Sequence, residues 1–224
     1  NERDEDLDDG QIDLNPQAPA GFLVTLNTAD ANPANWTKTQ IDMTGLADIA
    51  SSDPEPEYVA INEQNVAVVT LQENNHLVLV DLATNTVTAN FSAGFADLTQ
   101  VDTAEEGVIR FDSSLEQVPR EPDGVAWIND TLFATADEGD VNGGSRGFTI
   151  YNTSGEIIYT SGSTVDQIAA AAGHYPEQRS KNKGSEPENV TVATFDGTPY
   201  LFLNLERASL TLVYDLTNPA EPKL

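Results

Sequence analysis

One short motif occurs three times in this chain at a nearly constant spacing. Each copy is a Glu-Pro-acidic corner, followed by a β-rich run and a further acid. The corners begin at Glu55, Glu121 and Glu186, so their starts lie 66 and then 65 residues apart. A constant period over similar segments is typical of repeat architectures. We therefore expect one continuous repeated fold within the 224 residues, not a pair of independent domains.

Short β-branched and aromatic segments between turn residues predict thirteen strands and an all-β fold. The predicted ranges are 22–27 and 36–43, then 58–61, 66–71, 76–82 and 87–91, then 124–128, 131–136, 147–151 and 156–160, and finally 190–194, 200–204 and 210–216. Four-stranded antiparallel blades repeated around an axis form a β-propeller. Thirteen strands make about three to four such blades, which would leave open edges if they stood alone. We therefore expect the chain to be part of a larger ring, such as a seven-bladed one.

The domain organisation follows from these repeats. Residues 1–20 form an acidic N-terminal segment and residues 21–224 a propeller segment. The insertion 92–120 has no clear periodicity, so a long loop is predicted there. The range 164–172 is the one segment with a convincing helical pattern, and Gly173 is its stop signal.

The acidic N-terminus is either a calcium-binding loop or a solvated segment. Asp4, Asp6 and Asp8 have the spacing of an EF-hand loop, but the glycine that such a loop needs comes one residue late, at Gly10. The spacing therefore argues against an EF-hand.

Composition excludes several classes of function. There are 37 Asp and Glu against 10 Lys and Arg, a formal net charge of −27, which repels nucleic acid and attracts cations. The chain has no cysteine, so disulfides, thiolate nucleophiles and sulfur metal sites are absent. No run of about 18 apolar residues is present, so we expect no membrane span. Much of the acidic surface is explained by solvation alone, whereas the periodic acids need a separate explanation.

In a propeller, the first strand of each blade lines the axial channel, so equivalent corner positions lie in a ring. A further acid returns 18, 17 and 20 residues after the three corner starts. Oxygen ligands without cysteine, and with only two histidines, favour Ca²⁺, or alternatively Mg²⁺. The candidate metal ligands are Glu55, Glu57, Glu73, Glu121, Asp123, Glu138, Asp140, Glu186, Glu188 and Glu206.

A structural interpretation of the same acids is also open. A proline corner favours an extended start to a strand, and a carboxylate beside it can cap backbone N–H groups. Capping does not explain why a second acid returns at Glu73, Glu138 and Glu206. Arg146 and Arg207 are candidate ligand-binding residues for a phosphate or carboxylate, although ion pairing with the acids is the favoured interpretation.

The motifs together resemble the choice-of-anchor I family. The resemblance rests on the three corners with their following acids, over about residues 45 to 224, and includes the segments 69–75, 136–140, 183–188 and 205–209. It implies a secreted or surface-anchored bacterial β-propeller, related by name to mesenchyme-specific cell-surface glycoproteins. Some members are labelled alkaline phosphatase-like.

Two functions are expected from these observations. The first is a secreted or cell-surface, calcium-binding propeller that acts as an extracellular binding or adhesion module. The alternative is a Ca²⁺-dependent phosphohydrolase, although only 10 Lys and Arg are available to face a phosphate. Expected partners are a propeller segment or second chain that completes the ring, and an extracellular protein, glycan or phosphoester ligand.

Overall fold

The structure is a computed structural model that describes residues 18–224. The candidate calcium loop at residues 4–10 lies outside this part. Within the described residues the fold is all-β, with fifteen strands, one α-helix and two short 3₁₀ helices at 33–35 and 177–179. None of the helices in this part is long and apolar enough to cross a membrane.

Two complete four-stranded antiparallel sheets form the middle of the molecule. The first contains β3 (Pro56–Ile61), β4 (Val66–Leu71), β5 (His76–Asp81) and β6 (Thr86–Ser92) in chain order. The second contains β9 (Pro122–Trp127), β10 (Leu132–Asp137), β11 (Gly147–Asn152) and β12 (Ile157–Thr160). They are blades 1 and 2 below.

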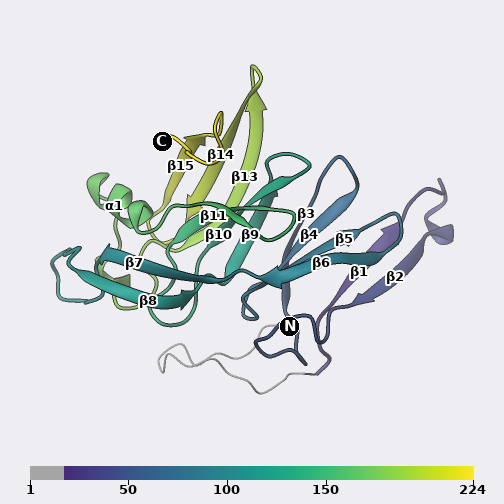
Figure 1. The fold of residues 1–224 in the computed structure, drawn as a ribbon, viewed down its shortest axis with the longest axis horizontal. Helices are drawn as coiled ribbons and strands as arrows, with labels where there is room; N and C mark the ends of the chain where they lie inside the picture. The colour runs from purple at the N-terminus through teal and green to yellow at the C-terminus, as the bar shows by residue number, and fades with distance from the viewer. Residues whose placement is uncertain (1–17) are drawn as a thin grey trace.

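Two smaller sheets flank these blades. Blade 3 contains β13 (Pro187–Phe195), β14 (Thr198–Leu205) and β15 (Leu210–Asp215), and the bridge from Asp215 to Lys223 lies along its outer strand. On the other side, β1 (Phe22–Asn27) pairs with β2 (Thr37–Asp42). The inner strand β9 packs against both β3 and β13, so the first strands of the three blades lie side by side, as Figure 1 shows. This radial arrangement is that of a β-propeller and confirms the predicted fold class.

The sheets are joined by apolar interfaces that follow chain order. Ile41 and Met43, in and just after β2, pack on Ala67, Val69 and Val78 of blade 1. Between blades 1 and 2, the ring of Phe133 stacks on that of Tyr151 with 5.6 Å between centroids, beside Leu77. Blades 2 and 3 share the largest hydrophobic cluster, which also includes Val165 and Ala169 of the helix between these blades. Each blade therefore buries its faces against its neighbours.

The prediction of a long loop in the insertion 92–120 is wrong. Here β7 (Phe95–Val101) and β8 (Ser113–Pro119) form an antiparallel hairpin, which adds two strands to the thirteen predicted. The register shifts twice, so the buried apolar residues fall at Ala96, Leu98 and Val101 and not at every second position. Because bulges interrupt the two-residue period, the sequence shows no clear alternation.

The predicted helix is confirmed to within one residue as α1 (Thr164–Ala171). It connects blades 2 and 3 and buries Val165, Asp166 and Ala169. Gly173 follows it with a φ of +78°, the left-handed conformation that commonly ends a helix. The helix thereby carries one buried carboxylate, Asp166, toward the loops that precede blade 3.

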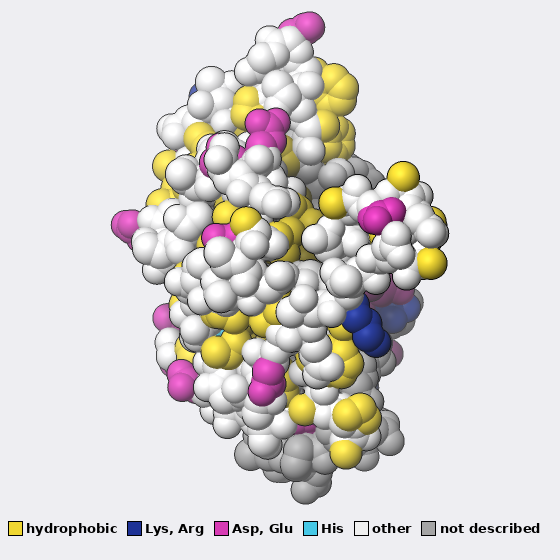
Figure 2. All heavy atoms as spheres, turned by 90° about the vertical axis from the view of Figure 1, so that its right-hand side faces the viewer, with side chains coloured by type: hydrophobic (Ala, Val, Ile, Leu, Met, Phe, Trp, Pro, Cys, Tyr) yellow, Lys and Arg dark blue, Asp and Glu magenta, His cyan; other side chains and the backbone are white. Residues whose placement is uncertain are grey.

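Acidic side chains are scattered over the face drawn in Figure 2 among exposed hydrophobic ones, whereas Lys and Arg gather at few places. Scattered exposed acids of this kind are solvated by water. The acids at the blade corners differ because several of them are buried, including Glu55, Glu121, Glu138 and Glu186. Burial of a carboxylate is costly unless it is paired, so the corner acids require specific partners.

Candidate metal site at the blade corners

The corner prolines set the start of the inner strands. Pro56, Pro122 and Pro187 are the first residues of β3, β9 and β13. A proline has no N–H to give to a sheet, so the first position of a strand is one of the few that accept it. The repeated Glu-Pro-acidic motif therefore has a common structural role in all three blades.

A bulge follows each of these prolines. The register with the second strand shifts directly after Pro56, Pro122 and Pro187, at the positions of the second corner acids. A bulge twists the strand locally and re-aims the side chain at the extra position. The second acids, Glu57, Asp123 and Glu188, thus leave the regular alternation of the sheet.

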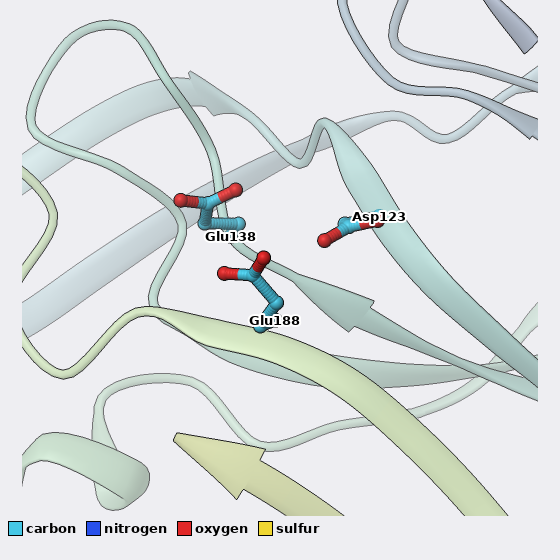
Figure 3. Close-up of side chains that lie close together, drawn as sticks. All are labelled: Asp123, Glu138 and Glu188. Carbon is cyan, nitrogen blue, oxygen red and sulfur yellow. The ribbon is translucent and has the colours of Figure 1, made fainter. Parts of the chain in front are cut away.

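Three carboxylates converge at the corners of blades 2 and 3. Asp123 comes from β9, Glu138 directly follows β10, and Glu188 lies in β13. Figure 3 shows the three side chains pointing toward one another. One oxygen from each lies within 4.8 Å of the others. All three residues belong to the predicted set, and we call them the carboxylate triad.

Burial and mutual repulsion make the triad hard to ionise. Burial, followed by the carboxylates of Glu188 and Glu138, raises the pKa of Asp123 to about 8. Burial, followed by Glu138 and Glu206, raises the pKa of Glu188 to about 7. The pKa of Glu138 is also raised, chiefly by burial, although Lys183 opposes the shift. Without a metal, the triad therefore retains protons at neutral pH, and a divalent cation would relieve the repulsion.

Glu138 is also part of a second group of polar side chains. The Lys183 ammonium donates to Glu138 Oε1 at 2.7 Å and to Asp140 Oδ1. From blade 1, the Gln72 amide donates to Glu138 Oε2 at 2.9 Å and to Asp140 Oδ2 at 3.4 Å. Neither Lys183 nor Gln72 belongs to the site residues predicted from the sequence. For Lys183, the available signal is a pair of lysines, Lys181 and Lys183, shortly before the third corner.

The first acid of each corner is buried, and the carboxylates of Glu121 and Glu186 bind other segments of the chain. Glu186 accepts from Arg179 Nε at 2.6 Å and from Arg207 Nε at 3.1 Å. Glu121 Oε2 accepts from the backbone N–H groups of Asp140 and Val141. These contacts match the structural interpretation, in which corner carboxylates bind backbone groups or neighbouring cations.

The remaining predicted ligands lie outside the triad. Glu55 is buried, and its backbone N–H donates to Asn74. Glu57 is exposed, and its charge acts on Asp123. Glu73 is buried in the turn after β4, and exposed Glu206 lies beside Glu188 and contacts Arg207. The structure thus gathers three of the ten candidates into one cluster and distributes the others around it.

The two predicted arginines differ in their surroundings. Arg146 is fully buried, and its guanidinium donates to the carbonyls of Asp102, Gly143 and Ser180 at 2.6–2.8 Å. It also contacts the Asp166 carboxylate at 3.3 Å. Arg207 is half-exposed and pairs with Glu186 and Glu206. Both arginines therefore neutralise carboxylates of this chain.

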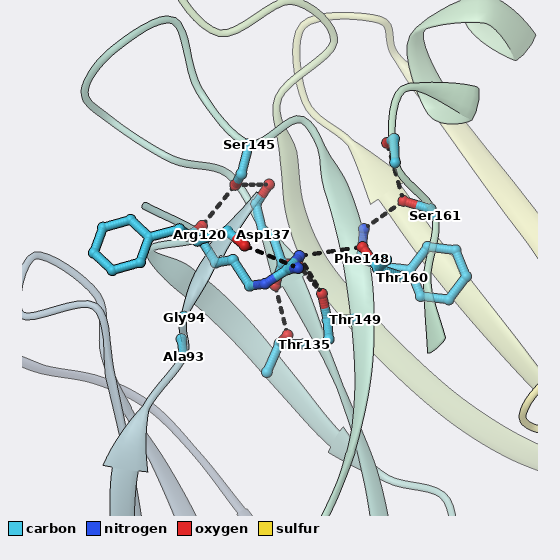
Figure 4. A network of polar contacts seen from close by, with 12 residues as sticks. Ala93, Gly94, Arg120, Thr135, Asp137, Ser145, Phe148, Thr149, Thr160 and Ser161 are labelled. Atoms are coloured by element: carbon cyan, nitrogen blue, oxygen red, sulfur yellow. Dashed lines mark hydrogen bonds and ion pairs between the residues drawn. The ribbon is translucent and has the colours of Figure 1, made fainter. Parts of the chain in front are cut away.

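A further buried arginine supports the corner of blade 2. Arg120 Nη1 lies 3.4 Å from Asp137 Oδ2 and donates to Thr149 Oγ1 at 2.9 Å, as Figure 4 shows. Thr135 Oγ1 donates to the other Asp137 oxygen at 2.6 Å. Because Asp137 directly precedes Glu138, this network fixes the backbone that carries one member of the triad. Arg120 is not among the predicted site residues, because Pro54 and Ser185 take its place in the other two repeats.

The radial blades and their acidic corners define a β-propeller segment with a repeated corner motif and one cluster of three carboxylates. The choice-of-anchor I domain matches residues 24–143 and 141–219. The chain belongs to the choice-of-anchor I family, as its motifs indicated. No curated protein matches the chain.

Several solved structures are similar to the chain at low sequence identity. A streptogramin B lyase has 12% identity and a TM-score of 0.48, over 85% of this chain and 44% of that one. The hydrazine synthase of Kuenenia stuttgartiensis has 12% identity and a TM-score of 0.45, over 75% and 34%. The RRP9 WD40 repeats have 9% identity and a TM-score of 0.37, over 75% and 52%. The match thus spans between 34% and 52% of the length of these structures.

Proposed function

We propose that this chain is a calcium-binding propeller module that acts outside the cytoplasm, on the cell surface or after secretion, and binds an extracellular protein or glycan. The convergence of Asp123, Glu138 and Glu188 carries the proposal. The carboxylates come from two blades, so an ion held by all three would also tie the blades together. The description of the family as choice-of-anchor supports the surface location.

The triad suits Ca²⁺ better than the smaller Mg²⁺. Ca²⁺–oxygen distances are about 2.3–2.6 Å, so two ligands on opposite sides of the ion lie about 5 Å apart. The 4.8 Å limit on the separations within the triad is compatible with that span. Mg²⁺ requires about 2.0–2.1 Å and near-octahedral geometry, and it usually keeps several waters and binds one or two carboxylates, so a set of three protein carboxylates favours Ca²⁺. Other oxygens, from water or the backbone, would complete the coordination.

The alternative function is a Ca²⁺-dependent phosphohydrolase. Such a site usually places Lys or Arg beside the metal to bind the phosphate. Around the triad, Lys183 is engaged by Glu138 and Asp140, while Arg179 and Arg207 are engaged by Glu186. These contacts favour a binding module. Hydrolysis of p-nitrophenyl phosphate that requires Ca²⁺ and is lost in Glu188→Gln would instead support the enzyme.

Calorimetric titration of the metal-free protein with CaCl₂ tests the calcium site. We expect binding by the wild type and affinities lowered at least about tenfold in Asp123→Asn and Glu188→Gln, because each removes a charged ligand. Asp196→Asn, at the exposed β13–β14 turn, and Glu116→Gln, on exposed β8, are matched controls that should bind as the wild type does. Absence of wild-type binding, or equal binding by Asp123→Asn and Asp196→Asn, would contradict the proposal.

A further inference from the structure

Lys183 is a buried cation placed directly beside the carboxylate triad. Its side chain is only 10% exposed, and its ammonium lies 2.7 Å from Glu138 Oε1. It also contacts Asp140 Oδ1. Glu138 is shared, because it belongs to the triad as well. The ammonium thus lies between the carboxylates of Glu138 and Asp140, which are also the kind of ligand that a metal ion binds.

An uncharged donor, the Gln72 amide, binds the other oxygens of the same two carboxylates. Gln72 Nε2 donates to Glu138 Oε2 at 2.9 Å and lies 3.4 Å from Asp140 Oδ2. The amide holds both carboxylates in place without neutralising them. The positive charge beside Glu138 and Asp140 therefore comes from Lys183.

The backbone that carries Lys183 is held on both sides. Before it, the carbonyls of Ser180 and Asn182 accept from Arg146 Nη2 at 2.7 and 3.3 Å. After it, Asp166 Oδ1 accepts from the Ser185 N–H at 3.0 Å. A lysine on a fixed backbone loses little further freedom when its ammonium is bound, so the position is preorganised.

Gly184 allows this close approach. Its φ is +62°, and a Cβ there would lie 2.4 Å from Asp166 Oδ2. Only a glycine accepts both conditions without displacing the carboxylate. The sequence around Lys183 is therefore adapted to present the ammonium at one place.

We propose that the Lys183 ammonium takes the place of a second cation and so limits this corner to one divalent ion. The inference rests on the proposed calcium site at the triad. When they are ionised, Asp123, Glu138, Asp140 and Glu188 carry four negative charges, and Lys183 neutralises one of them. Glu57 and Glu206 add charge beside Asp123 and Glu188. One divalent ion at the triad neutralises two further charges, and the ammonium keeps Glu138 and Asp140 from binding another ion. Without the lysine, the carboxylates of Glu138 and Asp140 lose their ammonium partner and would bind a second divalent ion.

The stoichiometry of Ca²⁺ binding, measured by calorimetric titration with CaCl₂, tests this role. Lys183→Met should bind one equivalent more than the wild type. Lys181→Met is the matched control, because Lys181 is two residues away, is 58% exposed and pairs with Glu105 only at 3.5 Å. It loses the same charge and should keep the wild-type stoichiometry. Lys183→Arg keeps the charge and should keep it as well.

An unchanged stoichiometry in Lys183→Met, or a gain in Lys183→Arg, would overturn the inference. If Lys183→Met folds poorly, Lys183→Gln gives the same test, since an amide can bond both carboxylates as Gln72 does while removing the charge. Circular dichroism confirms folding before each titration. The two proposals fail distinguishably: a wild type that binds no Ca²⁺ overturns the triad site and the inference with it, whereas one equivalent in both the wild type and Lys183→Met overturns only the role of the lysine.

Discussion

Glu121 and Glu186 share a backbone conformation that few side chains adopt. Their φ angles are +43° and +51°, in the left-handed region, and each directly precedes a proline. For a residue other than glycine this conformation costs about 1–2 kcal/mol. The buried contacts of the two carboxylates offset that cost. The hydrogen bonds and ion pairs of the Glu121 and Glu186 carboxylates therefore explain why glutamate occupies positions where the backbone conformation alone would favour glycine.

Substitution of Glu186 tests this explanation. Glu186→Gln should lower the free energy of unfolding by about 2 kcal/mol, less than for a fully buried pair because Arg179 and Arg207 both reach solvent. Urea denaturation measures the change. Glu221→Gln, an exposed carboxylate near the C-terminus, should shift the midpoint by less than about 0.5 kcal/mol. Equal effects of the two substitutions would refute the structural role of Glu186.

The residues that could be predicted from sequence were those that repeat. Asp123, Glu138 and Glu188 were recognised because equivalent acids return in each repeat. Lys183, Gln72 and Arg120 were not, because each has no repeated counterpart and acts through contacts between distant segments. Gln72, for example, lies 66 residues from the Glu138 that it contacts. A repeat in the sequence shows which residues the blades have in common. Residues that occur in one blade only, and that contact another segment, can be recognised only from the folded structure.

At the scale of elements, the bulges in β3, β9 and β13 connect the repeated motif to the site. The strands themselves were predictable from β-branched residues and turns. The bulges were not, and neither was the hairpin β7–β8, because an extra residue shifts the alternation on which strand prediction depends. Gly124 in β9 was the one available signal, since a glycine inside a strand often marks a bulge or a close approach.

Gly124 lies at the closest approach of two inner strands. A Cβ there would lie 2.7 Å from Asn189 Cα, so Gly124→Ala should push β9 away from β13 and separate Asp123 from Glu188. We expect a loss of about 1–3 kcal/mol in stability from overpacking. We also expect weaker Ca²⁺ binding, because the triad spans these two strands. Urea denaturation and calorimetry measure the two effects, and wild-type behaviour in both would show that the strands tolerate the methyl group.

At the scale of the whole molecule, the triad couples stability to pH. The pKa values of Asp123 and Glu188 are raised to about 8 and about 7, above those of unfolded carboxylates. The folded chain then binds more protons than the unfolded chain between about pH 4 and pH 8, so stability falls as pH rises through this window. Deprotonation is complete above the folded pKa values, and there the destabilisation is greatest.

Thermal melts in EDTA at pH 5.5 and 8.5 measure this fall. After allowance for solvent screening at half-exposed Glu188, a loss of about 2 kcal/mol corresponds to a melting temperature roughly 5 °C lower at pH 8.5. Asp123→Asn should flatten the dependence, and Asp196→Asn should keep it. Millimolar Ca²⁺ should restore the melting temperature at pH 8.5, because an ion that binds only the folded state stabilises it. Equal EDTA melts at the two pH values would contradict the raised pKa values.

Arg146 has a kinetic consequence. Its guanidinium is bound by the carbonyls of Asp102, Gly143 and Ser180, which belong to three separate segments of the chain. Removing a charged group from water is costly unless its partners are in place. We therefore expect these bonds to form late in folding, after the blades have packed. A substitution such as Arg146→Met should then leave the folding rate almost unchanged and accelerate unfolding. We therefore expect this side chain to affect the half-life of the folded state more than the speed of its assembly.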